Sequence, residues 1–124
     1  MGTDQLEVVV VGNGPVGLTL ANVLVNHGVR CRVLSKEPEQ RPVWESRAEG
    51  VHVRTVALLA RLGLYERAAA EGRPAHGFTL HSKQEIIARI PLDVPGSLYP
   101  GALILEQSKI ERMLADRLVS RGIE

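Results

Sequence analysis

The chain has 124 residues, 44% of them hydrophobic and 23% charged, with a formal net charge of +1, which suits one globular domain. This near-neutral balance and an aromatic content of 3% argue against a nucleic-acid partner. The single cysteine, Cys31, excludes a disulfide within the chain. No apolar run approaches the roughly 20 residues of a membrane span, and the start does not resemble a secretory signal. We therefore predict a cytoplasmic protein with no membrane contact.

The first 34 residues predict a βαβ unit. The first predicted strand covers residues 7–11, and its four valines form an apolar run of the kind expected for a strand buried on both faces. Residues 15–27 have helical spacing, and Gly28 follows as a helix-ending residue. Residues 29–34 alternate between apolar and basic side chains and predict a second strand, parallel to the first. The apolar face expected for the helix consists of Val16, Leu20, Val23 and Leu24.

The middle of the chain predicts shorter elements. Residues 36–46 are polar and contain proline, so we expect a loop. Two short helices are expected within residues 54–72, closed by Gly63 and Gly72. Two strand-like runs at 77–82 and 85–90, separated by a short polar turn, predict a β-hairpin, and the proline-rich residues 91–101 predict an excursion loop.

The last element is a predicted helix that begins after Ser108. Glu111 follows this serine by three residues, at the spacing of a capping box, in which the two side chains satisfy two free backbone N–H groups. The helix is expected to end at Gly122. The sequence then stops where a further parallel strand is expected, and we predict that it is a piece of a longer enzyme.

A glycine-rich turn links the first strand to the first helix. Gly12, Gly14 and Gly17 match the dinucleotide-binding pattern G-x-G-x-x-G in its expected context of strand, turn and helix. In that pattern the first glycine allows a tight turn, the second lets the backbone approach a pyrophosphate, and the third lets the helix pack closely. Unpaired N–H groups and the helix dipole then attract the phosphates.

The end of the second predicted strand carries Ser35 and Lys36, where a dinucleotide site usually has an acidic residue for the ribose hydroxyls. A small residue followed by a basic one is compatible with the 2′-phosphate of NADP. The four histidines have no metal-ligand spacing, so we predict no metal site.

Three ordered segments together resemble one enzyme family. "VVVVGNGPVGLTLANVLVNHGVRCRVLSK", "SRAEGVHVRTVALLARLGLYERAAAEGRPAHGFTLH" and "LILEQSKIERMLADRL" are similar to the N-terminal part of the p-hydroxybenzoate hydroxylase-like, FAD-dependent aromatic monooxygenases. The resemblance implies an incomplete Rossmann-like α/β fold of the glutathione-reductase type. Residues 1–124 would form part of the FAD-binding domain, and the hairpin near residues 76–92 would begin the substrate-domain region.

The resemblance also implies a set of FAD-binding residues. The turn would hold the pyrophosphate, Ser35 and Lys36 would lie at the adenosine ribose, Arg47 would contact the phosphate–ribose region, and Gln107 would reach the cofactor from the start of its helix. The turn residues implied are Gly12, Asn13, Gly14, Pro15, Val16 and Gly17.

The reaction implied by the family is hydroxylation of an aromatic or polyketide-type substrate by O₂, with NADPH reducing FAD. The family's Asp-Gly and Gly-Asp motifs are absent from this sequence, so no catalytic residue is predicted. The expected partner is the remainder of the enzyme or a complementary chain, including a second copy in a homodimer. Two alternatives stay open: an NAD(P)-binding module of another flavoprotein reductase, and a cofactor-free remnant that acts through protein interaction.

Overall fold

The computed structural model describes residues 6–36, 42–45 and 50–123. The chain divides into two compact units, one made of residues 1–46 and 107–124 and the other of residues 47–106. Across the described residues, no helix has the length and apolar character needed to cross a bilayer.

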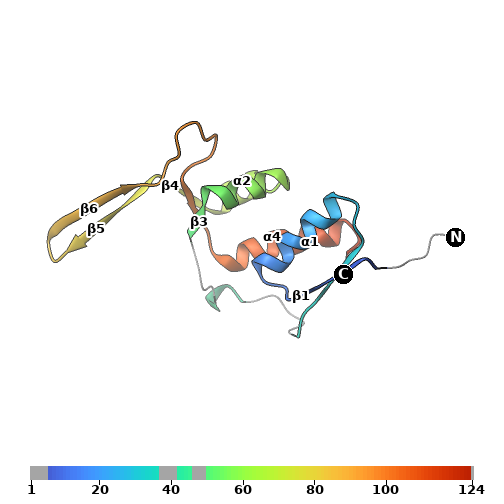
Figure 1. The fold of residues 1–124 in the computed structure, drawn as a ribbon. Coiled ribbons are helices and arrows are strands. Elements are labelled where there is room, and N and C mark those ends of the chain that lie inside the picture. Colours follow the sequence, from blue (N-terminus) through green and yellow to red (C-terminus); the bar gives the residue numbers. More distant parts are fainter. Residues whose placement is uncertain (1–5, 37–41, 46–49, 124) are drawn as a thin grey trace. The chain divides into compact units, whose positions relative to one another are not determined.

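The first unit contains the predicted βαβ arrangement (Figure 1). Strands β1 (Val8–Val11) and β2 (Cys31–Leu34) pair in parallel, in register from Val8 opposite Cys31 to Val11 opposite Leu34. Helix α1 (Pro15–Asn26) connects them, and Gly28 follows it with a φ of +75°. A short 3₁₀ helix, η1 (Val43–Glu45), lies in the predicted loop, and helix α4 (Gln107–Ser120) completes the unit.

Strand β1 is covered on one side only. Val10 is buried, whereas the side chains of Val9 and Val11 are 51% and 84% exposed. Side chains alternate along a strand, and helix α1 packs on the side of Val10. The prediction that this strand is buried on both faces is therefore wrong for the described chain.

The buried face of α1 also differs from the predicted one. Leu18, Ala21 and Asn22 are buried, whereas Val16 and Leu20 are 83% and 47% exposed. Val23 and Leu24 of the predicted face are half-buried, so the prediction is wrong for Val16 and Leu20. It left out Leu18 and Ala21 as well as Asn22, a polar residue that apolar spacing does not reveal. The exposed valines and Leu20 belong instead to the uncovered side of β1 and α1.

Asn22 joins α1 to α4 through a polar contact inside the unit. Its amide nitrogen donates to the carbonyl oxygens of Leu18 and Leu114 at 2.8 and 3.0 Å, and its amide oxygen accepts from Arg117 Nη1 at 2.9 Å. Arg117 Nη2 donates to Asn26 Oδ1 at 2.7 Å. These contacts match a parallel pair of helices, so both helices begin at the same end of the unit (Figure 1).

Helix α4 begins one residue before the predicted cap. Gln107 is already helical, Ser108 is buried, and the Ser108 hydroxyl has no hydrogen-bond partner among the described residues. The capping-box prediction is therefore wrong. Ser108 and Glu111 have the sequence spacing of a capping box, but the Glu111 carboxylate accepts a hydrogen bond from the Gln107 side chain instead.

The second unit is built on a three-stranded antiparallel sheet that the sequence did not predict. Its strands are β3 (Gly50–His52), β7 (Ala102–Ile104) and β4 (Arg73–Ala75), in the order β3-β7-β4. Helices α2 (Val53–Arg61) and α3 (Tyr65–Glu71) confirm the two predicted short helices. Strands of three residues are too short to display a periodic pattern.

The predicted hairpin is confirmed. Strands β5 (Gly77–Ser82) and β6 (Glu85–Pro91) are antiparallel and pair with no other described strand. Lys83 in the turn has a φ of +54°.

The predicted excursion loop after β6 is closed by Asp93. Asp93 Oδ1 accepts from the backbone N–H of Gly101 at 2.8 Å, and Asp93 Oδ2 lies 2.8 Å from His76 Nδ1. The Gly101 N–H and, to a lesser extent, His76 lower the pKa of Asp93. Within the same unit, the rings of Tyr65 and Tyr99 lie 4.8 Å apart.

Candidate functional site

The glycine turn begins where β1 ends. The Gly12 N–H donates to the carbonyl oxygen of Leu34 at 2.7 Å, which extends the β1–β2 pairing by one bond. Gly12 has a φ of +111°, a backbone conformation that residues other than glycine rarely adopt. The predicted role of this glycine in a tight turn is confirmed.

Gly17 allows α1 to approach the turn. A Cβ atom placed on this residue would lie 2.1 Å from the carbonyl oxygen of Gly12 and 3.4 Å from Val10 Cγ1. Such a separation from a backbone oxygen is far below van der Waals contact. The close packing predicted for this third glycine is therefore confirmed.

Gly14 and Pro15 form the start of α1. Gly14 is the N-cap residue, with φ −76° and ψ 179°, and Pro15 occupies the first helical position, where its missing N–H costs nothing. A Cβ on Gly14 would meet nothing within 4 Å, so the turn leaves open space at this residue. The first-turn N–H groups of a helix have no intrahelical acceptor, and here they adjoin that space.

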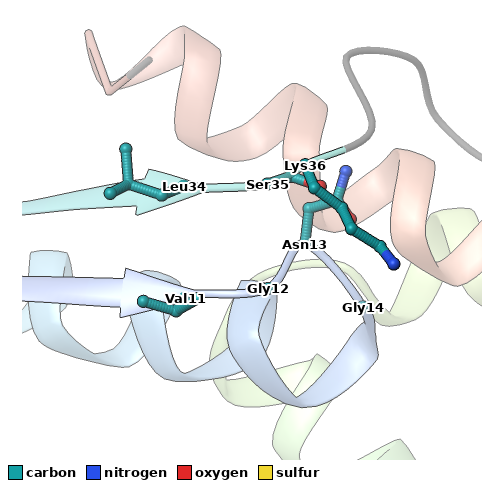
Figure 2. A pocket seen from close by; sticks show the side chains of 7 residues that line it. All are labelled: Val11, Gly12, Asn13, Gly14, Leu34, Ser35 and Lys36. Atoms are coloured by element: carbon teal, nitrogen blue, oxygen red, sulfur yellow. The ribbon is translucent and has the colours of Figure 1, made fainter.

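A cleft of about 390 Å³ lies between the turn and the end of β2 (Figure 2). In Figure 2 the Lys36 side chain extends from the end of β2 toward the glycine turn. The cleft is therefore bordered by a helix N-terminus, a hydroxyl and an ammonium group, and its open end is at the carboxyl ends of two parallel strands. The lining residues are Val11, Gly12, Asn13, Gly14, Leu34, Ser35 and Lys36.

This set of groups suits an anion. Backbone N–H groups at a helix start and a nearby ammonium group attract phosphate, and the Cβ-free Gly14 leaves room for a diphosphate to reach the backbone. Among the described residues that line the cleft there is no carboxylate, and a ribose bound there would meet the hydroxyl of Ser35. The residues present fit the diphosphate and ribose of a dinucleotide.

A second cavity of about 510 Å³ adjoins the turn on the uncovered side of β1. Its walls are mainly aliphatic, so it lacks the polar groups of the first cleft. Pro15, Val16 and Gly17 line this second cavity and not the first. Gly12 and Gly14 line both cavities, whereas Asn13 lines only the first.

The remaining predicted site residues have different outcomes. Gln107 is the first residue of α4, and its side-chain nitrogen donates to Glu111 Oε1 at 2.7 Å. Glu111 is only 4% exposed. Sequence reasoning missed this pairing because it assigned Glu111 to a cap. Arg47 lies outside the described residues.

Other reactive side chains have structural environments. Cys31 is buried, and burial raises the pKa of its thiol. His27 caps the C-terminus of α1, and His52 Nδ1 accepts from the backbone N–H of Arg54 at the start of α2. Within the described ranges, no three His, Cys, Asp or Glu side chains are grouped to hold a metal ion.

Comparison with known proteins identifies the relatives of this fold. The chain is 37% identical over 123 residues to 6-methylpretetramide 4-monooxygenase of Streptomyces rimosus, covering 97% of this chain and 22% of that protein. It superposes on p-nitrophenol 4-monooxygenase of Pseudomonas putida with a TM-score of 0.80 and 33% identity, covering 90% of this chain and 29% of the other. Anhydrotetracycline hydroxylase of Streptomyces rimosus gives a TM-score of 0.73 and 38% identity, over 94% and 23% of the two chains.

The chain therefore spans about a quarter of the length of these relatives. Residues 5–124 match the family model described as an FAD binding domain. The cofactor of this family is FAD, in agreement with the chemistry of the cleft. The chain belongs to the FAD-binding domain family that occurs in flavin-dependent aromatic and polyketide monooxygenases.

Proposed function

We propose that this chain supplies the diphosphate-binding and adenosine-binding part of an FAD-dependent monooxygenase that uses NADPH and hydroxylates an aromatic or polyketide-type substrate. The observation that carries the proposal is the cleft at the carboxyl ends of β1 and β2, bordered by the glycine turn and Lys36. The names of the relatives, which include a p-nitrophenol monooxygenase, a 6-methylpretetramide monooxygenase and an anhydrotetracycline hydroxylase, support the substrate class.

The residues of this chain bind and orient the cofactor in this proposal. The first turn of α1 receives the diphosphate, Lys36 neutralises part of its charge, and Ser35 donates to or accepts from the ribose. Gln107 adds a contact from the start of α4, and Arg47, which lies outside the described residues, adds another. Bound FAD supplies the redox chemistry.

Titration of the purified chain with FAD, followed by quenching of flavin fluorescence, tests the proposal. We expect saturable binding of FAD and competition by ADP, because the cleft recognises the shared diphosphate and adenosine. Binding of NADPH tighter than that of FAD would instead favour the NAD(P)-module alternative, which Ser35 and Lys36 support. Absence of both would contradict the proposal.

The Ser35→Glu variant gives a second test of the same cleft. A carboxylate at this position is the usual partner of the ribose hydroxyls, and a charge-assisted hydrogen bond is worth roughly 1 kcal/mol more than a neutral one. We expect FAD to bind about fivefold more tightly. Ser82→Glu, in an exposed strand of the hairpin, is the matched control and should leave the affinity unchanged.

We further propose that the uncovered side of β1 and α1 packs against additional polypeptide of the same enzyme. Val9, Val11, Val16 and Leu20 are exposed there, and the relatives are about four times as long as this chain. Apolar groups gathered in this way are typical of buried interfaces. Among the described strands β1 pairs only with β2, and a sheet edge without a neighbouring strand favours strand addition.

Hydrogen exchange of the β1 amides tests this packing. For the β1 amides that do not bond to β2, we expect rapid exchange in the 124-residue chain alone and slow exchange when the chain is expressed together with a polypeptide matching the remaining length of a relative. Slow exchange in the chain alone, accompanied by a dimer in sedimentation, would assign the surface to a second copy instead.

The hairpin β5–β6 is proposed to belong to the substrate-binding region. Phe78 and Leu80 pair across the hairpin with Ile90 and Ala88 and therefore share one face with them. Phe78, Leu80 and Ile90 are exposed, and an apolar sheet face suits contact with an aromatic substrate or with strands that enclose one. Photo-crosslinking from Phe78 to a bound substrate in the full-length enzyme would test this placement.

A further inference from the structure

Glu111 is a buried carboxylate in the second turn of α4. Its exposed fraction is 4%, and a buried carboxylate is costly unless hydrogen-bond donors satisfy it. The Gln107 side-chain nitrogen donates to Glu111 Oε1 at 2.7 Å, within the short range of charge-assisted bonds. Glu111 therefore holds the side chain that opens the helix.

The chemistry of a carboxylate decides which way the Gln107 amide faces. An ionised carboxylate only accepts hydrogen bonds, whereas an amide group has a donating and an accepting end. The donating end of Gln107 must therefore face Glu111, and the carbonyl oxygen faces away from it. A neutral partner at position 111 would accept either orientation of the amide.

The fold places this oriented amide at the end of the unit where the cleft lies. The contacts of Asn22 and Arg117 hold α1 and α4 parallel, so the two helices begin at the same end of the unit (Figure 1). Their first residues are Pro15 and Gln107. Strands β1 and β2 also finish at this end, where the cleft is found.

We propose that Glu111 is a positioning residue of the cofactor site, which fixes the Gln107 amide so that its carbonyl oxygen accepts a hydrogen bond from a hydroxyl group of the bound dinucleotide. The inference rests on the proposed FAD-binding function. Glu111 does not touch the cofactor itself and acts through Gln107.

A double-mutant cycle in FAD affinity tests this inference. The variants are Glu111→Gln, which keeps the size of the side chain, Gln107→Ala, and the two combined. We expect Glu111→Gln to weaken FAD binding by roughly three- to tenfold, through lost orientation. In the Gln107→Ala background the same change should have no further effect, because residues that act as a unit are not additive.

Ser108→Ala is the matched control. Ser108 neighbours Gln107 on the same helix, is buried, and has a hydroxyl without a hydrogen-bond partner in the described part of the chain. Its removal should leave the FAD affinity unchanged. Equal losses in Ser108→Ala and Glu111→Gln would show a general effect of the helix start and would overturn the inference.

The outcomes separate this inference from the function on which it rests. If the unaltered chain binds no FAD, the proposed function fails and this inference fails with it. Suppose that the unaltered chain binds FAD. If Glu111→Gln then binds FAD equally well, only the positioning role fails. The same holds if Glu111→Gln weakens FAD binding by the same factor in the presence of Gln107 and in the Gln107→Ala background.

A cofactor-free measurement covers the case in which Glu111→Gln does not fold. Nuclear magnetic resonance of the unaltered chain without FAD should show one Gln107 side-chain amide proton that is strongly deshielded and exchanges slowly, as expected for a short bond to a carboxylate. Two averaged, rapidly exchanging amide protons would overturn the proposal.

Discussion

Gly17→Ala isolates the contact between α1 and the glycine turn. The added Cβ would lie 2.1 Å from the Gly12 carbonyl oxygen and 3.2 Å from its carbonyl carbon. Both atoms belong to the backbone, so relief requires movement of the turn or of the helix by about 1.4 Å, because ordinary contacts are near 3.5 Å.

The magnitude follows from two opposing effects. Alanine is favoured over glycine inside a helix by about 1 kcal/mol, whereas overpacking costs about 1–3 kcal/mol or more. Because this clash involves backbone, we expect the second effect to prevail and the free energy of unfolding to fall by roughly 2 kcal/mol. For 124 residues with an unfolding entropy of about 2.1 cal/mol/K each, this corresponds to about 8 °C in Tm.

Urea unfolding followed by circular dichroism measures the change. Gly50→Ala is the control, because a Cβ at that strand residue would meet nothing within 4 Å, and its effect should stay within about 0.5 kcal/mol. Gly14→Ala should likewise keep most of the stability yet weaken FAD binding, since its Cβ would enter the open cleft. A Gly17→Ala chain as stable as the unaltered one would refute the packing argument.

Three further predictions concern buried or bridging polar groups. Asn22→Ala should lower the free energy of unfolding by about 1–3 kcal/mol in urea titrations, because Arg117 Nη1 loses an acceptor in a partly buried position; an unchanged midpoint would contradict the role of this contact. Ser108→Ala should be neutral or stabilise the chain by up to about 1 kcal/mol, since its buried hydroxyl has no partner among the described residues. Removal of a true N-cap side chain would instead lower the free energy of unfolding by about 1 kcal/mol. The pKa of Asp93 is lowered mainly by the Gly101 N–H, so the folded state binds its proton less readily than the unfolded chain does. Its contribution to stability is therefore present above the ordinary aspartate pKa of about 4 and is lost as the pH falls through the lowered pKa. The Gly101 amide resonance should move in that acidic window, and Asp93→Asn should abolish the movement.

The elements that the sequence predicted well are those with strong local signals. The turn was recoverable because Gly12 and Gly17 are needed for a positive φ and for a close approach. The hairpin was recoverable from two apolar runs with a short polar turn. These features depend on neighbours in the sequence, and periodicity or glycine spacing reveals them directly.

The elements that the sequence missed depend on distant partners. Strand β7 pairs with β3, whose residues lie about 50 positions earlier, and neither strand is long enough to show a pattern. The burial of Asn22 depends on Leu114 and Arg117, which no local rule connects with it. The Gln107–Glu111 pair was visible as a spacing, but that spacing equally fits a cap.

The link between Asn22 and Leu114 has a consequence for the order in which the chain becomes ordered during synthesis. The two residues are separated by 92 positions, and ribosomes add roughly 5–20 residues per second. The nascent βαβ segment thus waits about 5–20 s before the carbonyl that its asparagine needs has been made. Until then the amide can bond only to the Leu18 carbonyl of its own helix or to water, so the segment that carries the glycine turn completes its packing only after α4 leaves the ribosome.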